Sequence, residues 1–184
     1  MSTRILTLVE NSVHRLNLIA EHGLSFLISA GDETILFDTG QGGALIPNAA
    51  QMEIDLSGVS SCVLSHGNQD HTGGLAGILD RLRSVPLYAH PSAFLPKYTS
   101  RTKELRAIGI PMERRILEES GIQIRQCEAP VEISSGIIAS GPIPRVTDFE
   151  QIPSHFLRDA SDGSGLIPDT LEDDQAIIIT HGDW

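Results

Sequence analysis

Hydrophobic and polar residues alternate along much of the first forty positions, as is typical of strands with one buried face. The alternation predicts strands at residues 5–9, 24–30 and 34–37. Gly31 and Asp32 separate the last two of these strands and form a turn signal. The two strands should therefore pair as a β-hairpin.

The pattern changes to strand, helix, strand over the next fifty residues. A glycine-bearing loop at 38–43 precedes a predicted helix at about 44–52, and the short apolar run 62–64 suits a buried strand. Apolar residues then recur at helical spacing, at positions 75, 78, 79 and 82, and residues 86–89 predict the next strand. Two strands joined by a helix favour parallel pairing, so we predict an α/β fold.

The second half of the chain has a weaker pattern. A helix is predicted at 112–120, and strands are predicted at 122–127, 131–133, 136–139 and 176–180. Residues 161–168 are polar and glycine-bearing, which predicts a loop. We interpret residues 91–168 as a cap-like insertion, and residues 1–184 as a single domain because no linker or repeat divides them.

Composition places the chain among soluble globular proteins. It has 40% hydrophobic and 20% charged residues, and 13 basic against 24 acidic side chains give a net charge of −11. No apolar run is long enough to span a membrane, and the acidic balance disfavours nucleic acid. The first residues lead directly into a strand without an export signal, so we expect a cytoplasmic protein. Cys62 and Cys127 are expected to be free buried thiols rather than a disulfide.

The residues between the strand at 62–64 and the following helix carry the candidate chemistry. His66 and Asn68 share one face of an extended segment, while Asp70 and His71 stand at the helix entry. Imidazole nitrogens and carboxylate oxygens are ligands for zinc, iron or manganese, so these four residues are candidate metal ligands. The alternative is a helix capped by Asp70 beside two surface histidines, but capping does not explain the glycine pair at 73–74.

This segment resembles the H-x-H-x-D-H signature of the metallo-β-lactamase superfamily. A longer match runs from Glu21-His22-Gly23-Leu24-Ser25 through Asp38-Thr39-Gly40 to Asp70-His71-Thr72-Gly73-Gly74. It resembles the branch of dihydropterin ribofuranosyl-aminobenzene phosphate synthase-like proteins. The resemblance implies an αββα sandwich with a metal site at the edge of its two sheets.

Residue by residue, the resemblance makes His66 a ligand of a first metal ion and Asp70 and His71 ligands of a second. Asp70 would also be the catalytic residue that orients the nucleophile. Asp38 would hold the metal ligands in position without binding the metal itself, although a simple loop cap is the alternative. The cofactor would be zinc, as one or two ions, with iron or manganese as other choices.

Two departures from the family pattern weaken the expected metal site. Asn68 stands where the family has its second histidine, and an amide oxygen is a poorer ligand for zinc than imidazole. Family members also continue past the strand equivalent to 176–180 into further ligand residues, so we expect the sandwich to lack its C-terminal part here. The remaining four donors all come from one loop.

Three other polar residues are candidate substrate-binding groups. Asn11 ends the first strand, His90 follows the strand at 86–89, and Arg145 has a guanidinium group that matches phosphate geometry. The alternative is that Asn11 only forms a turn and that His90 and Arg145 are ordinary surface residues. The acidic run 172–174 is interpreted as a solvated strand entry.

Two functional hypotheses follow. The first is a metal-dependent hydrolase of a phosphoester or related small molecule, acting through metal-activated water. The second is a degenerate or incomplete domain with weak metal binding, little catalysis and a role in a dimer or beside a partner chain. A homodimer through the strand at 176–180 is expected because a free apolar strand edge favours association.

Overall fold

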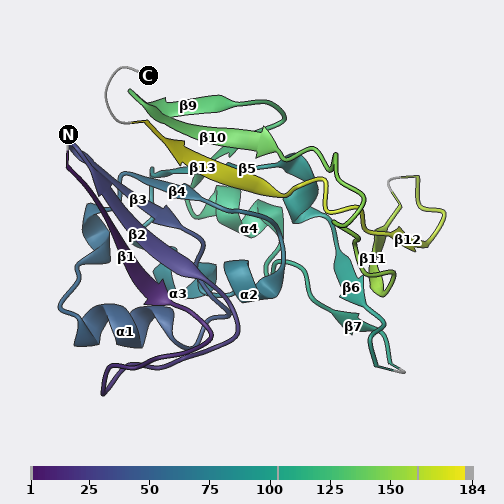
Figure 1. Cartoon of the computed structure of the whole chain (residues 1–184), viewed down its shortest axis with the longest axis horizontal. Helices are drawn as coiled ribbons and strands as arrows, with labels where there is room; N and C mark the ends of the chain where they lie inside the picture. The colour runs from purple at the N-terminus through teal and green to yellow at the C-terminus, as the bar shows by residue number, and fades with distance from the viewer. Residues whose placement is uncertain (1, 103, 161, 181–184) are drawn as a thin grey trace.

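The computed structural model describes residues 2–102, 104–160 and 162–180. Its centre is a six-stranded sheet with the strand order β1-β2-β3-β4-β5-β8 (Figure 1). β2 pairs with β1 and β3 in antiparallel orientation. The strands β3, β4, β5 and β8 are parallel to one another. Their bounds are β1 Thr3–Val9, β2 Ser25–Ala30, β3 Glu33–Phe37, β4 Ser61–Val63, β5 Pro86–Ala89 and β8 Gln123–Gln126.

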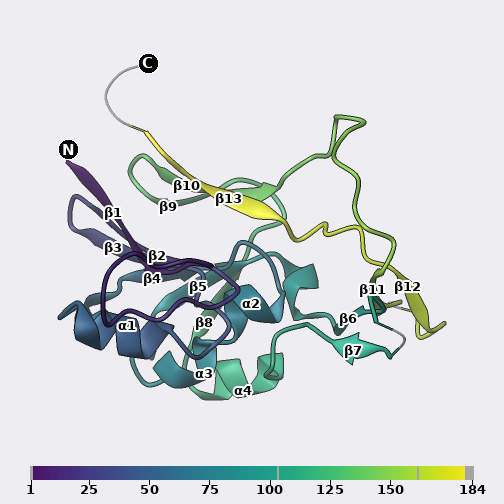
Figure 2. The same cartoon turned by 60° about the horizontal axis from the view of Figure 1, so that its bottom comes forward.

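Helices lie together on one face of this sheet, and a three-stranded sheet of order β13-β10-β9 lies over its other face (Figure 2). The helices are α1 Leu45–Gln51, α2 Gln69–Thr72, α3 Leu75–Ile78 and α4 Arg114–Glu119, and two 3₁₀ helices are η1 Leu56–Gly58 and η2 Pro91–Phe94. The three strands are β9 Val131–Ser134, β10 Ile137–Pro142 and β13 Gln175–Ile179. The described residues thus form the helix, sheet and sheet layers expected of an αββα sandwich.

Alternation along the central strands explains why the large sheet is buried on both faces. Leu36 of β3 packs into the cluster on the helical side, whereas its neighbours Ile35 and Phe37 pack into the cluster beneath the second sheet. β4 repeats this arrangement, because Cys62 faces the helices and Val63 faces the second sheet. Successive side chains of a strand point to opposite faces, so two separate cores form.

The hairpin, the parallel strands and the helices α1 and α4 were predicted correctly, with end shifts of a few residues. The predicted helix through positions 75–82 is wrong in length, because α3 ends at Ile78. Both cysteines are free and buried, as expected. No helix among the described residues is long and apolar enough to cross a membrane.

A third sheet was not predicted. It has the order β12-β11-β6-β7, and it places β12 within residues 161–168, where a loop was expected. Its strands are short and partly exposed, and β6 pairs with the distant β11, so no local alternation marks them. The bounds are β6 Lys97–Thr99, β7 Arg106–Ala107, β11 Phe156–Asp159 and β12 Leu166–Pro168.

Residues 91–168 contribute strands to all three sheets. Only their first and last parts form the third sheet, which projects beside the two main layers (Figure 1). β13 pairs with β10 in antiparallel register, Ile179 opposite Ile137, and has no strand on its other edge among the described residues. Association through that edge stays a prediction.

Candidate metal centre

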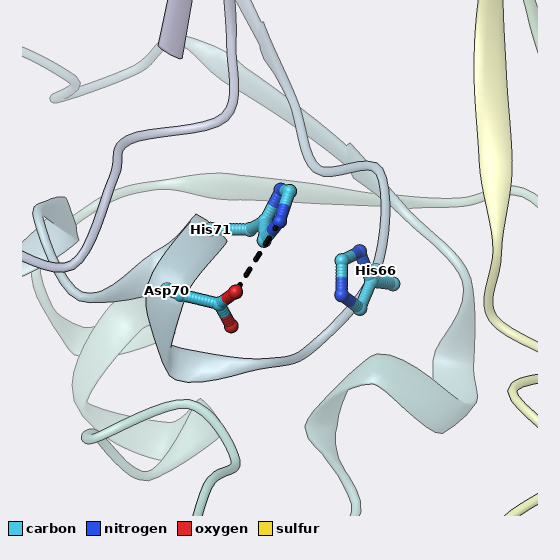
Figure 3. Close-up of side chains that lie close together, drawn as sticks. All are labelled: His66, Asp70 and His71. Atoms are coloured by element: carbon cyan, nitrogen blue, oxygen red, sulfur yellow. Dashed lines mark ion pairs between the residues drawn. The ribbon is translucent and has the colours of Figure 1, made fainter. Parts of the chain in front are cut away.

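The loop after β4 and the short helix α2 that follows it bring three candidate ligands together. His66, Asp70 and His71 each offer one ligand atom, and these atoms all lie within 4.8 Å of one another (Figure 3). The Nε2 atom of His71 lies 3.6 Å from Oδ2 of Asp70, and the two imidazole ring centres are 4.3 Å apart. This group could hold a metal ion, as the sequence pattern predicts.

Asp38 fixes the orientation of His71. The Asp38 side chain is fully buried directly after β3, and its Oδ2 atom lies 2.7 Å from Nδ1 of His71. Ser65 donates its backbone N–H and its hydroxyl to the same carboxylate, both at 2.7 Å. A carboxylate accepts hydrogen bonds, so the proton of His71 belongs on Nδ1 and the Nε2 lone pair faces Asp70. This is the contact that a supporting residue behind a metal ligand makes.

The two histidines experience opposite electrostatic effects. Burial and the nearby His71 lower the pKa of His66, so its neutral form is favoured. Burial would also lower the pKa of His71, but the hydrogen bond and charge of Asp38, together with Asp70, outweigh burial and raise that pKa. Neutral imidazole is the metal-binding form, so His66 is ready to act as a ligand.

Asn68 lies at the start of α2, where its backbone carbonyl accepts the N–H groups of His71 and Thr72. Its side chain makes no capping hydrogen bond, and its buried Oδ1 atom has no hydrogen-bond partner among the described residues. A buried oxygen without a partner is costly unless a cation or a water molecule binds it. The side chain is therefore available as a neutral oxygen donor.

Two of the cavities that border these residues have different linings. One of about 460 Å³ is lined by Asn68 and Asp70 together with Arg101, Arg106 and His155. The other, of about 730 Å³, has mostly apolar walls from β2 and β13 and reaches His66 and His71. The candidate ligands thus border one cavity that carries two arginine side chains and another with mostly apolar walls.

A model of the metallo-beta-lactamase superfamily matches residues 18–150. The chain belongs to this superfamily. It is 32% identical over 174 residues to the uncharacterized protein MJ0448 of Methanocaldococcus jannaschii, covering 93% of this chain and 64% of that protein. It is 28% identical over 169 residues to the 7,8-dihydropterin-6-methyl-4-(beta-D-ribofuranosyl)-aminobenzene-5'-phosphate synthase of the same organism, covering 87% of this chain and 57% of the synthase. The chain thus spans less than two thirds of either relative.

The fold of this metallo-beta-lactamase superfamily chain also matches a solved structure. The crystal structure of Tm1679, a metal-dependent hydrolase of the beta-lactamase superfamily, superposes with a TM-score of 0.73 at 24% identity. The match covers 97% of this chain and 61% of Tm1679. At this identity the comparison supports the fold.

A buried ion-pair network supports the backbone of the candidate metal centre. The ammonium group of Lys97 donates to Asp173 at 2.7 Å and to Asp169 at 3.0 Å, and none of the three side chains is more than 3% exposed. The second oxygen of Asp173 accepts the N–H of Gly67 at 2.7 Å. Asp173 was expected in a solvated acidic run, and that expectation is wrong because Lys97, from β6, packs against it.

Glycines allow the loops around the site to approach closely. A Cβ at Gly73 would overlap the carbonyl oxygen of Gln41, and one at Gly74 would overlap that of Thr39. The carboxylate of Glu21 accepts the N–H groups of Gln41, Gly42 and Gly43. The backbone donors of this glycine-bearing loop are therefore occupied by a side chain of the protein itself.

The three candidate substrate-binding residues lie in different places. Asn11 lines a small cavity together with Asp70 and His71. Its Oδ1 atom accepts the N–H of Gly23 and lies 3.1 Å from Nδ1 of His22. Arg145 pairs with Asp174 at 2.6 Å, and Asp174 in turn lies 3.9 Å from His66. His90 caps η2 by accepting the N–H of Ser92. Sequence reasoning did not select His22, whose Nε2 lies 3.3 Å from Oδ2 of Asp70.

The network around Asp173 predicts a loss of stability in acid. Burial would raise the pKa of Asp173, but Lys97 and the Gly67 amide outweigh burial and hold that pKa below its usual value. Such a carboxylate stabilises the fold above its unfolded pKa of about 4 and loses this effect as pH falls through the folded-state value.

Urea unfolding followed by circular dichroism measures this effect. The Asp173→Asn variant should be less stable than the parent protein by a constant amount above about pH 5, and the difference should shrink below about pH 4. A difference that is the same at pH values on both sides of this range would contradict the assigned role of the ionised carboxylate.

Proposed function

We propose that this chain is a metal-dependent hydrolase of a small phosphoester or a related anionic molecule. The supporting observation is the position of Asp70, which belongs to the cluster with His66 and His71 and also lines the cavity that carries Arg101 and Arg106. Two guanidinium groups beside a candidate metal centre suit a phosphate-bearing substrate. The name of the 28% identical relative also contains a ribosyl phosphate compound, which belongs to this substrate class.

The donor set fits a divalent metal ion. His66, Asp70 and His71 would hold it, and the unpartnered Oδ1 of Asn68 is a further candidate donor. Zinc suits a set of imidazole and carboxylate ligands, while iron and manganese are the other candidates. When bound, such an ion supplies Lewis-acid polarisation of the substrate and lowers the pKa of a water molecule.

The remaining chemistry belongs to the chain's own side chains. Asp38 holds His71 in one tautomer through the contact at Nδ1, so His71 does not need to reorient during turnover. Asp70 presents a carboxylate oxygen that can accept a hydrogen bond from the attacking water and orient it. Arg101 and Arg106 would bind and position the anionic group of the substrate.

A second candidate function is a domain with weak metal binding and little catalysis, and Asn68 is the observation that favours it. An amide oxygen at this position is a weaker zinc donor than imidazole. If this weakness limits the site, Asn68→His should raise both zinc affinity and turnover. An unchanged zinc affinity in this variant would show that Asn68 does not limit the site.

Hydrolysis of bis(p-nitrophenyl) phosphate after loading with zinc, iron(II) or manganese(II) tests the proposal. We expect chelator-sensitive turnover that Asp70→Ala abolishes. Arg106→Gln should raise KM by about 10–100-fold, since a hydrogen bond to a charged group contributes about 1.5–3 kcal/mol. Arg115→Gln on α4 is the matched control, because Arg115 forms an exposed ion pair with Glu119.

The loss or persistence of turnover separates the two candidate functions. Turnover that is equal in the parent protein and in Asp70→Ala would overturn the hydrolase proposal. Metal binding without turnover in any loaded form would favour the second candidate function. A KM that Arg106→Gln leaves unchanged would remove the polar cavity from the substrate site.

A further inference from the structure

Ser65 lies between Asp38 and His66 at the strand ends that carry the candidate metal centre. Its hydroxyl oxygen is 2.7 Å from Oδ2 of Asp38 and 2.9 Å from Nδ1 of His66. The same oxygen lies 3.3 Å from Nδ1 of His71, which is a longer contact. One hydroxyl group therefore contacts a fully buried carboxylate and both histidines of the centre.

The backbone of Ser65 is also fixed on both sides of its Cα atom. Its N–H donates to Oδ1 of Asp38 at 2.7 Å, and its carbonyl oxygen accepts the N–H of Gln175, from β13, at 2.8 Å. Asp38 directly follows β3, and Ser65 comes two residues after the parallel neighbour β4. The hydroxyl group therefore has little freedom to leave the space between Asp38 and His66.

The carboxylate of Asp38 determines where the hydroxyl proton of Ser65 points. A carboxylate only accepts hydrogen bonds, so the hydroxyl 2.7 Å from it is the donor. If the hydroxyl donated to His66 instead, two oxygen atoms would lie 2.7 Å apart without a proton between them. The lone pairs of the hydroxyl oxygen therefore face Nδ1 of His66. An acceptor at this position places the proton of the imidazole on Nδ1 and leaves the Nε2 lone pair for a metal ion.

Asp174 favours the same proton position on His66. Its Oδ1 atom lies 3.9 Å from Nδ1 of His66, and its Oδ2 atom accepts a hydrogen bond from Arg145 at 2.6 Å. A carboxylate at 3.9 Å is too far for a hydrogen bond but still attracts a proton on the facing nitrogen. The hydrogen bond itself therefore comes from Ser65, at 2.9 Å.

His66 and His71 receive the same orientation by two routes. Asp38 contacts Nδ1 of His71 directly at 2.7 Å, whereas it reaches Nδ1 of His66 through the hydroxyl of Ser65. Both Nε2 atoms are then unprotonated, which is the form that binds a metal ion. His66 extends from the loop, while His71 and Asp70 come from α2 (Figure 3). One carboxylate thus orients candidate ligands from two separate elements.

We propose that Ser65 is a positioning residue of the metal centre, whose hydroxyl extends the hydrogen bonding of Asp38 to His66 and so presents Nε2 of His66 to the metal ion. This inference rests on the metal centre of the proposed function. Ser65 acts through His66 and does not itself bind the ion. A serine after a strand is commonly a turn former, so only the contacts on both sides of its hydroxyl indicate this role.

The tautomer of His66 in the metal-free whole chain tests this inference. Long-range ¹H–¹⁵N NMR of the ¹⁵N-histidine-labelled protein at about pH 8 measures it, above the ordinary histidine pKa of about 6.5. In the parent protein, Nδ1 should carry the proton in both His66 and His71. In Ser65→Ala, His66 should lose this preference and both of its nitrogen resonances should move. His71 should keep its Nδ1 proton, because Asp38 still contacts it.

Zinc affinity, measured by competition with a chromophoric chelator, is the second readout. Ser65→Ala should bind zinc about 10–100-fold more weakly, which is the usual cost of removing a partner that orients a metal ligand. Ser65→Thr keeps the hydroxyl and should stay close to the parent protein. Ser60→Ala is the matched control, because the Ser60 hydroxyl also donates to a carboxylate, that of Glu33, at an exposed position. This control should change neither the tautomer nor the affinity.

The outcomes distinguish this inference from the function on which it rests. A His66 tautomer that Ser65→Ala leaves unchanged would overturn the inference even if zinc affinity fell, because the loss would then be structural. Equal zinc affinity of the parent protein and Ser65→Ala, with binding lost in His66→Ala, would overturn the role of Ser65 and leave the metal centre intact. A parent protein that binds no zinc, iron(II) or manganese(II) would overturn the metal centre itself, together with the role of Ser65 toward it.

Discussion

Replacing Lys97 by methionine is expected to lower the free energy of unfolding by about 3–5 kcal/mol, the range for breaking a buried ion pair from one side. The ammonium group of Lys97 contacts both Asp169 and Asp173, and all three side chains are buried. Without Lys97, two carboxylates would remain close together with no cation between them. Methionine keeps most of the side-chain volume, so lost packing adds little to the expected effect.

Urea unfolding measures this loss, and Arg115→Met provides the control. Arg115 forms an exposed ion pair with Glu119 on α4, and such pairs contribute about 0.3–0.5 kcal/mol. A Lys97→Met variant that unfolds at nearly the same urea concentration as Arg115→Met would show that the carboxylates are neutral or solvated. Zinc affinity should also fall in Lys97→Met, because Asp173 binds the backbone between His66 and Asn68.

The second large effect is expected for Gly73→Ala. The added Cβ would overlap the carbonyl oxygens of Gln41 and Gln69, which are backbone atoms and cannot rotate away. Overpacking of this kind costs about 1–3 kcal/mol, and the upper end applies because two backbone segments must separate. The turn that carries His71 would move with them, so zinc affinity should decrease together with stability.

Gly77→Ala is the matched control for this substitution. Gly77 lies in α3, and an added Cβ would meet the side chain of Ile46 at an ordinary contact distance of 3.5 Å. Alanine is favoured over glycine within a helix by about 0.5–1 kcal/mol, so this variant should be slightly more stable than the parent protein. Equal unfolding midpoints of Gly73→Ala and Gly77→Ala would contradict the close approach between the two loops.

The sequence by itself determined most strands of the large sheet and the residues of the candidate metal centre that are neighbours along the chain. Alternation over residues 25–37 indicates the hairpin, and the strand-helix-strand pattern after residue 61 indicates parallel pairing, as β4 and β5 have. These elements depend on local periodicity and turn chemistry, which a sequence displays directly. The candidate donors His66, Asp70 and His71 were also apparent, because they are neighbours along the chain.

Only the tertiary structure decided which distant side chains contact the residues of the candidate site. Lys97 and Asp173 are 76 residues apart in sequence, and an acidic run looks solvated until its buried cation is known. His22 meets Asp70 because β1, β2 and the glycine loops place two separate segments at one end of the sheet. The strands of the third sheet likewise depend on the pairing of β6 with β11. Contacts of this kind arise from packing between remote segments, so no local pattern of residues encodes them.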